Sequence, residues 1–397
     1  MAQDGTMTFE TDLTRCPRPF NIERGRETAA LVQGISKPLV DLFTGTAGSS
    51  PYLATLISKE ADWIAPALDN PEAAVEAEFV ECLSASHDLL GSKLRQAKRR
   101  IALLTALADL GGAWTLEQVT GTLSRFADTA CTAAMRAGIA QQIKRGKLPG
   151  LAADDTATAG GMVALAMGKM GANELNYSSD IDLICLFDET RFEPDDYSEA
   201  RMGFARATRM MTSLLSDLTG EGYVFRTDLR LRPDPSVTPV CIAMEAAERY
   251  YESLGRMWER AAYIKARPAA GDLEAGETFL KSLGPFVWRK HLDFAAIQDA
   301  HDMRLAIRQH KGLGGPITLA GHNMKLGRGG IREIEFFTQT RQLIAGGRDP
   351  KLRMRGTREG LDALAGMGWI EQDLAQMLSD HYVAHRTVEH RLQMVRD

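Results

Sequence analysis

The sequence lacks several features that mark large classes of protein. Its five cysteines lie far apart and form no Cys-x-x-Cys pair, which argues against a zinc ribbon or a disulfide framework, and we expect reduced thiols. No stretch approaches the roughly 20 apolar residues that a membrane-spanning helix needs. Residues 1–10 also lack the basic start and apolar core of a secretory signal. We therefore expect a cytoplasmic protein with no membrane partner.

An excess of positive charge is also missing. The chain has 47 basic and 52 acidic residues and a net charge of −5, so no global basic field predicts binding to nucleic acid. No internal repeat or low-complexity segment is visible in the sequence. What remains is an ordinary globular composition, 44% hydrophobic and 25% charged, in 397 residues, which is enough for two or three domains.

Hydrophobic periodicity divides the chain into three regions. Residues 1–150 form a helical leader, with one helix over 71–110 that ends at Gly111 and Gly112, and an alanine-rich helix over 116–147. Residues 151–240 combine strands at 162–167, 181–187 and 223–231 with a helix at 204–218. Residues 241–397 return to helix, at 244–254, 257–265, 273–283, 293–309, 331–345, 357–365 and 370–394.

This order predicts an α+β fold that is mostly α, in which a small sheet lies between a helical leader and a helical C-terminal region. No glycine or proline stop signal follows residue 394, so we expect the last helix to continue in a longer chain.

An acidic pair opens the second predicted strand. Asp180 and Asp182 are two residues apart, and side chains two apart on a strand point to the same side. Two carboxylates held that close repel each other, and a divalent cation would relieve the repulsion. Hard oxygen ligands beside a phosphate-bearing substrate favour Mg²⁺, with Mn²⁺ as a substitute. The alternative is an exposed pair of aspartates that binds nothing.

A third carboxylate lies on the strand predicted at 223–231. The alternation there puts Arg226, Asp228, Arg230 and Arg232 on one face and apolar residues on the other. We interpret Asp228 as a third metal ligand among phosphate-binding arginines, although an exposed edge strand of mixed charge would show the same pattern. Three carboxylates suit a two-metal site, in which the ions clamp the attacking and leaving oxygens of phosphoryl transfer.

Glycine and serine residues precede the acidic pair. Gly168 and Gly171 flank Lys169 after the first predicted strand, where the backbone must turn sharply. Ser178 and Ser179 offer hydroxyl and backbone donors to a phosphate. The spacing is not that of a P-loop, which needs four residues between its glycines. The glycines become informative only because the acidic pair follows them closely.

The combination resembles the nucleotidyltransferase fold of the DNA polymerase β superfamily. More narrowly, it is similar to glutamine synthetase adenylyltransferase, the bifunctional family that adds AMP to glutamine synthetase and removes it. The resemblance covers essentially the whole chain and is strongest over 163–345. It rests on five segments: GKMGANELNYSSDIDL (168–183), DLRLRP (228–233), WER (258–260), KAR (265–267) and KLGRGGIREIEF (325–336). One departure is Ala172, where the family often has a second glycine.

The resemblance carries expectations about activity. Members of this family have two similar catalytic halves, and residues 329–336 resemble the version found in the N-terminal, AMP-removing half. This implies that inorganic phosphate attacks the adenylyl-tyrosine of adenylylated glutamine synthetase and gives ADP and the unmodified synthetase. It also implies regulation by the PII signal protein or its uridylylated form, with glutamine as an effector. We expect the half that uses ATP to lie outside this sequence.

The resemblance also assigns roles to residues. It implies metal binding by three aspartates and nucleotide phosphate binding by a glycine and two serines: Asp180, Asp182, Asp228, Gly168, Ser178 and Ser179. Residue chemistry adds four further candidate phosphate contacts: Lys169, Arg230, Arg232 and Lys265. Alternatively, Lys265 and Arg267 form a charge pair at a helix end. We expect Glu333 or Glu335, which cannot share a helix face, to contact Arg232 or Arg260.

Three functions therefore stay open. The first is phosphorolytic removal of AMP, the second is ATP-dependent adenylylation of glutamine synthetase, and the third is a catalytically idle module that senses PII. Intact carboxylates at three positions argue against the third, because an idle domain has no need to keep three repelling charges together.

Overall fold

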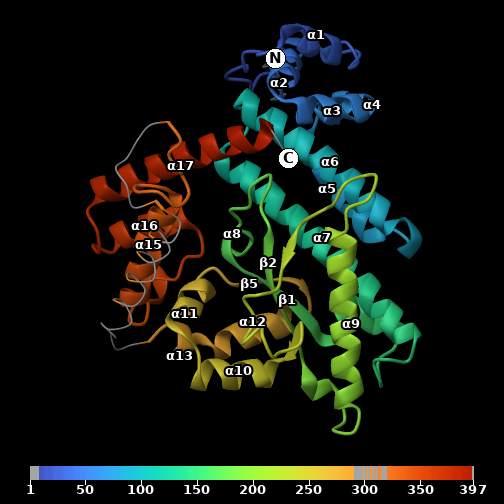
Figure 1. The fold of residues 1–397 in the computed structure, drawn as a ribbon, viewed down its shortest axis with the longest axis vertical. Helices are drawn as coiled ribbons and strands as arrows, with labels where there is room; N and C mark the ends of the chain where they lie inside the picture. The colour runs from blue at the N-terminus through green and yellow to red at the C-terminus, as the bar shows by residue number, and fades with distance from the viewer. Residues whose placement is uncertain are drawn as a thin grey trace, which may run out of the picture.

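The N-terminal region is helical, as the sequence predicts. The computed structural model describes residues 9–289 and 320–395, together with positions 298, 302, 305, 309, 312 and 313. In Figure 1 the blue N-terminal helices lie at one end of the molecule. These four short helices are α1 (Ile22–Ala29), α2 (Lys37–Ser49), α3 (Pro51–Lys59) and α4 (Ala61–Ala67).

Three longer helices complete the leader, and one expectation about them is wrong. The single helix predicted over 71–110 is two helices, α5 (Pro71–Ser84) and α6 (His87–Gly111). Ala85 and Ser86 between them have extended backbones, with ψ of 136° and 154°. Neither residue is a glycine or proline, so hydrophobic spacing alone did not reveal the break.

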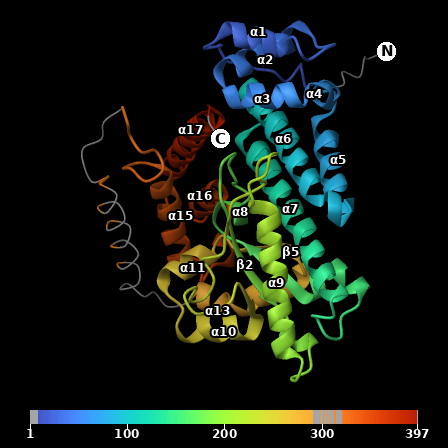
Figure 2. The same ribbon diagram turned by 45° about the vertical axis from the view of Figure 1, so that its right-hand side comes forward.

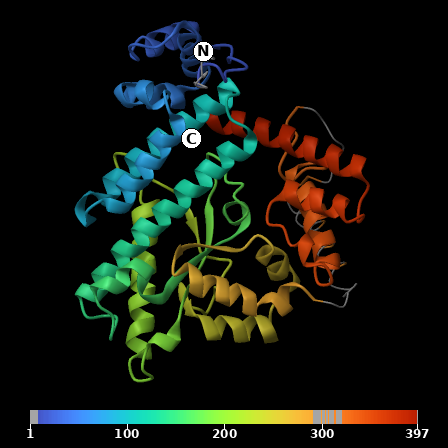
Figure 3. The same ribbon diagram turned by 180° about the vertical axis from the view of Figure 1, so that it is seen from behind.

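The other limits of these helices follow familiar end signals. Helix α6 ends at Gly112, whose φ of +71° is the left-handed conformation that favours glycine at this position. Helix α7 (Leu116–Lys144) begins with a capping box, in which Thr115 and Gln118 satisfy each other's backbone N–H groups. Seen from behind, α6 and α7 run side by side past the sheet (Figure 3).

The central sheet is mixed and has five strands in the described chain. Strands β1 (Met162–Ala166) and β2 (Ile181–Phe187) are antiparallel, and β5 (Arg267–Gly271) pairs antiparallel with the other edge of β1. Strands β3 (Thr227–Asp228) and β4 (Cys241–Ala243) both pair in parallel with β2, one after the other along its length. The sheet therefore includes strands from beyond residue 240, and the predicted mostly helical α+β class is confirmed.

The strand predicted at 223–231 is wrong over most of its length, because only Thr227 and Asp228 pair with the sheet. Val224 and Phe225 are both buried, so the segment does not alternate there. Their N–H groups both donate to the carbonyl of Leu215 at the end of a helix, at 2.9 and 3.0 Å. Charge alternation could not distinguish this packing from a strand.

Helices cover both faces of the sheet. On one face lie α7 and α9 (Tyr197–Ser216), which pack on alternate residues of β1 such as Ala164 and on Leu183 of β2. The opposite face, which carries Val163 and Ile184, is covered by a second group. Its members are α10 (Met244–Ser253), α11 (Met257–Tyr263), α12 (Leu273–Ser282) and α13 (Gly284–Val287).

The C-terminal helices form a separate group that reaches back to the N-terminal helices (Figure 2). They are α15 (Ile331–Ala345), α16 (Thr357–Gly366) and α17 (Gln372–Val395), all within two residues of their predicted limits. The hydroxyl of Ser50, which precedes α3, donates to the carbonyl of Met394 near the end of α17. The helix predicted at 293–309 lies outside the continuously described residues.

Short elements complete the fold. The one-turn helix α8 covers Gly168–Gly171, and 3-10 turns cover Ala153–Gly161, Glu189–Arg191 and Pro350–Leu352. Among the described residues, no helix is both long and apolar enough to cross a membrane.

Candidate functional site

Asp182 and Asp228 lie side by side on two neighbouring strands. Strands β2 and β3 are parallel, and their register pairs Asp182 with Asp228 directly. Ile181 and Leu183 on either side of Asp182 point into the apolar core under α7 and α9, so the Asp182 side chain points to the other face. The sheet therefore brings two of the three predicted metal ligands together from positions 46 residues apart in the sequence.

Asp180 stands just before β2 rather than within it. The side chain is half exposed, and its Oδ1 accepts a hydrogen bond from Nε of Arg226 at 2.5 Å. Only Asp182 has strand geometry. The prediction that strand alternation points Asp180 and Asp182 to the same side is therefore wrong for Asp180. The two carboxylates are still close enough to interact, because Asp180 contributes to the raised pKa of Asp182.

The electrostatic setting of Asp182 suits an oxygen ligand for a cation. Burial, followed by repulsion from Asp228 and Asp180, raises the pKa of Asp182 to about 6, while Arg332 and Lys325 oppose the rise. In the part of the chain described, no hydrogen bond reaches the Asp182 carboxylate. Three neighbouring carboxylates, one of them without a partner, are a donor set that fits a hard divalent cation.

The other two carboxylates are instead neutralised by arginine. Arg230 donates to both oxygens of Asp228, at 3.0 Å from Nε to each, and these bonds hold the pKa of Asp228 below its usual value. Across residues 9–289 and 320–395, no group of three His, Cys, Asp or Glu side chains is gathered as closely as a metal site needs. The aspartates are thus adjacent, but two of them are turned onto their arginine partners.

Gly168 makes room for Asp182. Its φ is +55°, and a Cβ at this position would stand 3.0 Å from Oδ2 of Asp182. A side chain here would suffer both backbone strain and contact with the carboxylate. Gly171 is equally confined, because a Cβ there would lie 2.0 Å from the carbonyl oxygen of Lys265. The one turn of α8 is thus packed tightly between the chain around Lys265 and the aspartate triad, which is Asp180, Asp182 and Asp228.

The serines predicted to bind phosphate are in a hydrogen-bonded loop. Ser179 accepts a bond from the backbone N–H of Asn176 through its hydroxyl, at 3.2 Å. The N–H of Ser178 donates to Oε1 of Gln393 on α17 at 3.3 Å, and its carbonyl accepts from Arg226 at 3.0 Å. The loop is therefore held on one side by Arg226, which also bonds to Asp180, and on the other side by α17.

Two predicted phosphate contacts are lysines already paired with carboxylates. The ammonium group of Lys169 lies 3.1 Å from both oxygens of Glu389, and burial lowers the pKa of Lys169 to about 8. Lys265 is buried and lies 2.9 Å from Glu174 and 3.1 Å from Glu335. Although burial opposes it, Lys265 keeps the pKa of Glu335 at about 2. Both lysines thus have structural partners.

Two expectations about neighbouring charges are corrected by this arrangement. The expectation is wrong for Glu335, which pairs with Lys265 and not with Arg232 or Arg260, while Glu333 accepts a hydrogen bond from the N–H of Gly329 at 2.9 Å. Lys265 and Arg267 do not form a charge pair at a helix end, because Arg267 opens β5 and pairs with Asp128 at 2.8 Å. Charge type was predicted correctly here, but the partners lie far away in the sequence.

The predicted arginine contacts differ in their exposure. Arg230 is largely exposed, and within the described part of the chain it is bonded only to Asp228. Arg232 donates to the backbone carbonyls of Leu229, Pro235 and Thr238, at 2.8, 3.0 and 3.1 Å, and so it closes the turn after β3. Arg230 can therefore move toward a ligand without disturbing the fold, whereas Arg232 holds a loop together.

Several residues near the site were missed by sequence reasoning. Arg386, Glu389 and Gln393 occupy one face of α17, with spacings of three and four residues. The guanidinium of Arg386 is fully buried and donates to the carbonyl of Glu174 at 2.7 Å and to the side chain of Asn176. The available signal was the polar stripe on the predicted helix. In the structure this stripe contacts another region of the chain rather than solvent.

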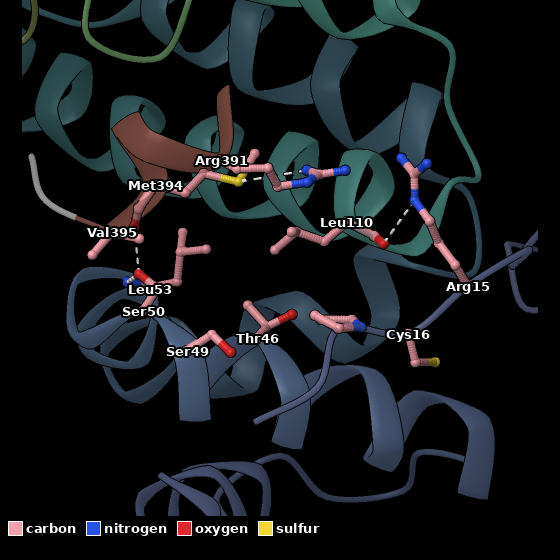
Figure 4. Close-up of a pocket in the computed structure, with 11 residues that line it drawn as sticks. Arg15, Cys16, Thr46, Ser49, Ser50, Leu53, Leu110, Arg391, Met394 and Val395 are labelled. Carbon is pink, nitrogen blue, oxygen red and sulfur yellow. Dashed lines mark hydrogen bonds between the residues drawn. The ribbon is translucent and has the colours of Figure 1, made fainter. Parts of the chain in front are cut away.

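A cavity elsewhere does not belong to this site. It has a volume of about 310 Å³ and lies between α2, α3, the end of α6 and the end of α17 (Figure 4). Its lining includes Thr46, Ser49 and Leu53 from the N-terminal helices and Arg391 and Met394 from α17. None of the predicted metal or phosphate ligands lines it, so the triad remains the candidate functional site.

Comparison with protein families gives two matches. Residues 41–282 match the family model for glutamate-ammonia ligase adenylyltransferase, and residues 300–397 match the model described as GlnD PII-uridylyltransferase. The first match contains all three aspartates and both glycines of α8.

Curated relatives agree with the first match. A relative from Agrobacterium fabrum is 46% identical over 381 residues, which are 93% of this chain and 38% of the relative. One from Rhizobium meliloti is 54% identical over 306 residues, which are 77% of this chain and 31% of the relative. Both carry the name bifunctional glutamine synthetase adenylyltransferase/adenylyl-removing enzyme. The chain therefore spans between about a third and two fifths of the length of these relatives.

Proposed function

This chain belongs to the glutamate-ammonia ligase adenylyltransferase family, and on that premise we propose that it is a nucleotidyltransferase that removes AMP from adenylylated glutamine synthetase. The observation that carries the proposal is the register of β2 and β3, which places Asp182 beside Asp228 with Gly168 against them. The direction of transfer is supported by the sequence of residues 329–336, which resembles the AMP-removing half of the family.

The reaction is a displacement at the α-phosphorus of the adenylyl-tyrosine. An oxygen of inorganic phosphate forms a bond to this phosphorus, the bond to the tyrosyl oxygen breaks, and that oxygen takes up a proton. The products are ADP and an unmodified tyrosine. Little covalent chemistry is asked of the protein, which has to hold the two phosphate groups in line and neutralise their charge.

The residues of the site are suited to that task. The carboxylates of Asp180, Asp182 and Asp228 would hold two Mg²⁺ ions, which neutralise charge on the phosphoryl oxygens when bound. Arg226 and Arg230 lie beside these carboxylates and are exposed enough to contact a phosphate. Gly168 keeps the face of Asp182 open, because any larger residue would crowd its carboxylate.

The C-terminal region supports a regulated activity. Its match to the GlnD PII-uridylyltransferase model favours a role in which residues 300–397 communicate with the PII signal protein or its uridylylated form. One ion pair and two hydrogen bonds join α17 to residues 169–178. These contacts give such a signal a route to the loop that carries Ser178 and Ser179. Glutamine would act as an effector of the same region.

The test is an assay of the purified chain with adenylylated glutamine synthetase, Mg²⁺ and inorganic phosphate. Release of ADP that requires phosphate supports AMP removal. Release of pyrophosphate from ATP with unmodified synthetase would favour ATP-dependent adenylylation instead, since the same carboxylates can serve both directions. No turnover in either direction, with retained binding of the synthetase, would favour a catalytically idle PII-sensing module.

A further inference from the structure

The cations expected to contact phosphate are mostly occupied by other partners. Lys169 is paired with Glu389, Lys265 is buried between two glutamates, and Arg232 is bonded to backbone carbonyls. Arg230 is largely exposed but already neutralises Asp228. Arg226 and Arg230 can contact one phosphate group, so a second phosphate group brought to the triad needs cations from another part of the chain.

Two such cations stand on the segment that leads into α15. Lys325 and Arg332 are both exposed, and in the described chain neither side chain makes a hydrogen bond or an ion pair. They start from neighbouring points of the backbone, because the N–H of Arg332 donates to the carbonyl of Lys325 at 3.0 Å. The two charges are thus carried as a pair, although they are seven positions apart in the sequence.

The segment that carries this pair is held in place. The side chain of Asn323 accepts from the N–H groups of Lys325 and Leu326 at 3.1 and 2.9 Å. At the glycine turn, the carbonyl of Gly329 is 2.9 Å from Nε2 of His385 on α17. Because α17 also holds the loop at 174–178, one helix fixes both the basic pair and the phosphate loop.

The basic pair faces the triad. Glu335 lies one helical turn after Arg332, on the same face of α15, and it is bonded to Lys265. The carbonyl of Lys265 in turn packs against Gly171 of α8, so this face of α15 looks toward α8 and the start of β2. The field agrees with the geometry, since both Arg332 and Lys325 lower the pKa of Asp182.

We propose that Lys325 and Arg332 bind the phosphate group that is not part of the transferred AMP. In AMP removal this group is inorganic phosphate, and in ATP-dependent adenylylation it is the terminal phosphates of ATP. The planar fork of Arg332 can bind two phosphate oxygens at once, whereas Lys325 supplies a point charge beside it. This inference rests on the proposed function and adds the binding site for the attacking group.

The experiment measures the KM for phosphate in the ADP-release assay. Replacing Arg332→Ala or Lys325→Ala should raise this KM by about 10- to 100-fold, the range for one charged hydrogen bond, while the KM for adenylylated synthetase changes little. Arg332→Lys should fall between Arg332→Ala and the wild type, since it keeps the charge and loses the fork. Arg328→Ala is the matched control, because Arg328 is an exposed arginine on the same segment.

Binding of Mg²⁺–ADP, measured by titration calorimetry, separates this inference from the proposed function. If the wild type releases ADP and the Arg332 and Lys325 variants keep its KM for phosphate, the inference is overturned and the proposed function stands. If the wild type shows no turnover, the calorimetry decides. Weaker ADP binding in the Arg332 and Lys325 variants than in Arg328→Ala supports the inference, and equal or absent binding in all of them overturns it.

Discussion

The molecule has two groups of charged residues that differ in their contact with solvent. The edge charges, Asp180, Asp228, Arg226 and Arg230 around Asp182, pair at the edge of the sheet, and Arg230 is 82% exposed. The buried cluster is formed by Lys265, Glu174, Glu335 and Arg386, and its members have exposures as low as 0%. The first group lies on or next to β2 and β3, whereas the second joins the chain next to the sheet to α15 and α17, which Figure 1 shows beside it.

The difference teaches which charges are available for chemistry. Exposed ion pairs contribute only about 0–1 kcal/mol to stability. The edge charges can therefore exchange their partners for a metal ion or a phosphate at little cost in free energy. Breaking a buried pair costs about 3–5 kcal/mol, because the remaining charge is left without a partner. The buried cluster therefore positions the loop at 174–179, and we propose that the edge charges act on the substrate.

The largest effect is expected from a substitution of Asp182, at the centre of the edge charges. Asp182→Asn should lower the turnover of AMP removal by at least about 10³-fold, because the ligand between the other two carboxylates is lost. Its free energy of unfolding should stay within about 1–2 kcal/mol of the wild type, since a neutral side chain also relieves the repulsion at this position. ADP release and urea denaturation measure the two effects.

Asp188→Asn is the matched control for this substitution. Asp188 follows the far end of the same strand, where it caps the short turn after it at 3.0 Å from the N–H of Thr190 and pairs with Arg191 at 3.4 Å. Turnover by Asp188→Asn should be close to that of the wild type. Near-normal turnover by Asp182→Asn would remove this residue from the catalytic site.

The next effect tests the buried cluster. Lys265→Met should lower the free energy of unfolding by about 3–5 kcal/mol, because Glu174 and Glu335 would stay buried without their cation. Lys325→Met, on the exposed basic pair, should change stability by no more than about 0.5 kcal/mol. Unchanged stability of Lys265→Met, together with a raised KM for phosphate, would instead make Lys265 the phosphate contact that its charge suggested.

A smaller loss is expected at Arg386. Arg386→Lys keeps the buried charge but cannot reach Glu174, Asn176 and Tyr382 together, so it should lose about 1–3 kcal/mol of stability. The loop at 174–178 should loosen, and its backbone amides should exchange hydrogen faster than in the wild type. Unchanged exchange in this loop would show that α17 does not hold it.

The smallest effect is a pH dependence due to Lys169. Burial lowers its pKa to about 8 from an ordinary value of 10.5. Between these pH values the unfolded chain binds a proton that the folded chain has lost, so the free energy of unfolding rises with pH, by at most about 1.4 kcal/mol per pH unit. Lys169→Met should lack this rise, which denaturation at pH 7.5 and pH 10 can measure. The same slope in both proteins would contradict the lowered pKa.

Much of the fold could be predicted because local signals were strong. The strand at 181–187 and the helix at 331–345 have their predicted limits, since each is an apolar pattern with clear ends. Two local patterns misled the prediction. The break at Ala85 carries no glycine or proline, and the charges at 226–232 alternate although only two of the surrounding residues are in a strand.

The site was predictable in part for the same reason. Asp182 and Asp228 were identified from their chemistry, and the sheet brings them together. The partners of Lys265 could not be predicted, because Glu174 and Glu335 are 91 and 70 residues away and only the tertiary fold joins them. Lys325 and Arg332 were visible as part of a segment, but their direction toward Asp182 depends on how α15 is packed.

Titration with Mn²⁺, followed by electron paramagnetic resonance, tests most directly whether the paired aspartates form a metal site. The wild type is predicted to bind two Mn²⁺ ions that Mg²⁺ displaces, Asp182→Asn to lose at least one of them, and Asp188→Asn to keep both. Equal Mn²⁺ binding by Asp182→Asn and the wild type, or no binding by either, would contradict the assignment of this site.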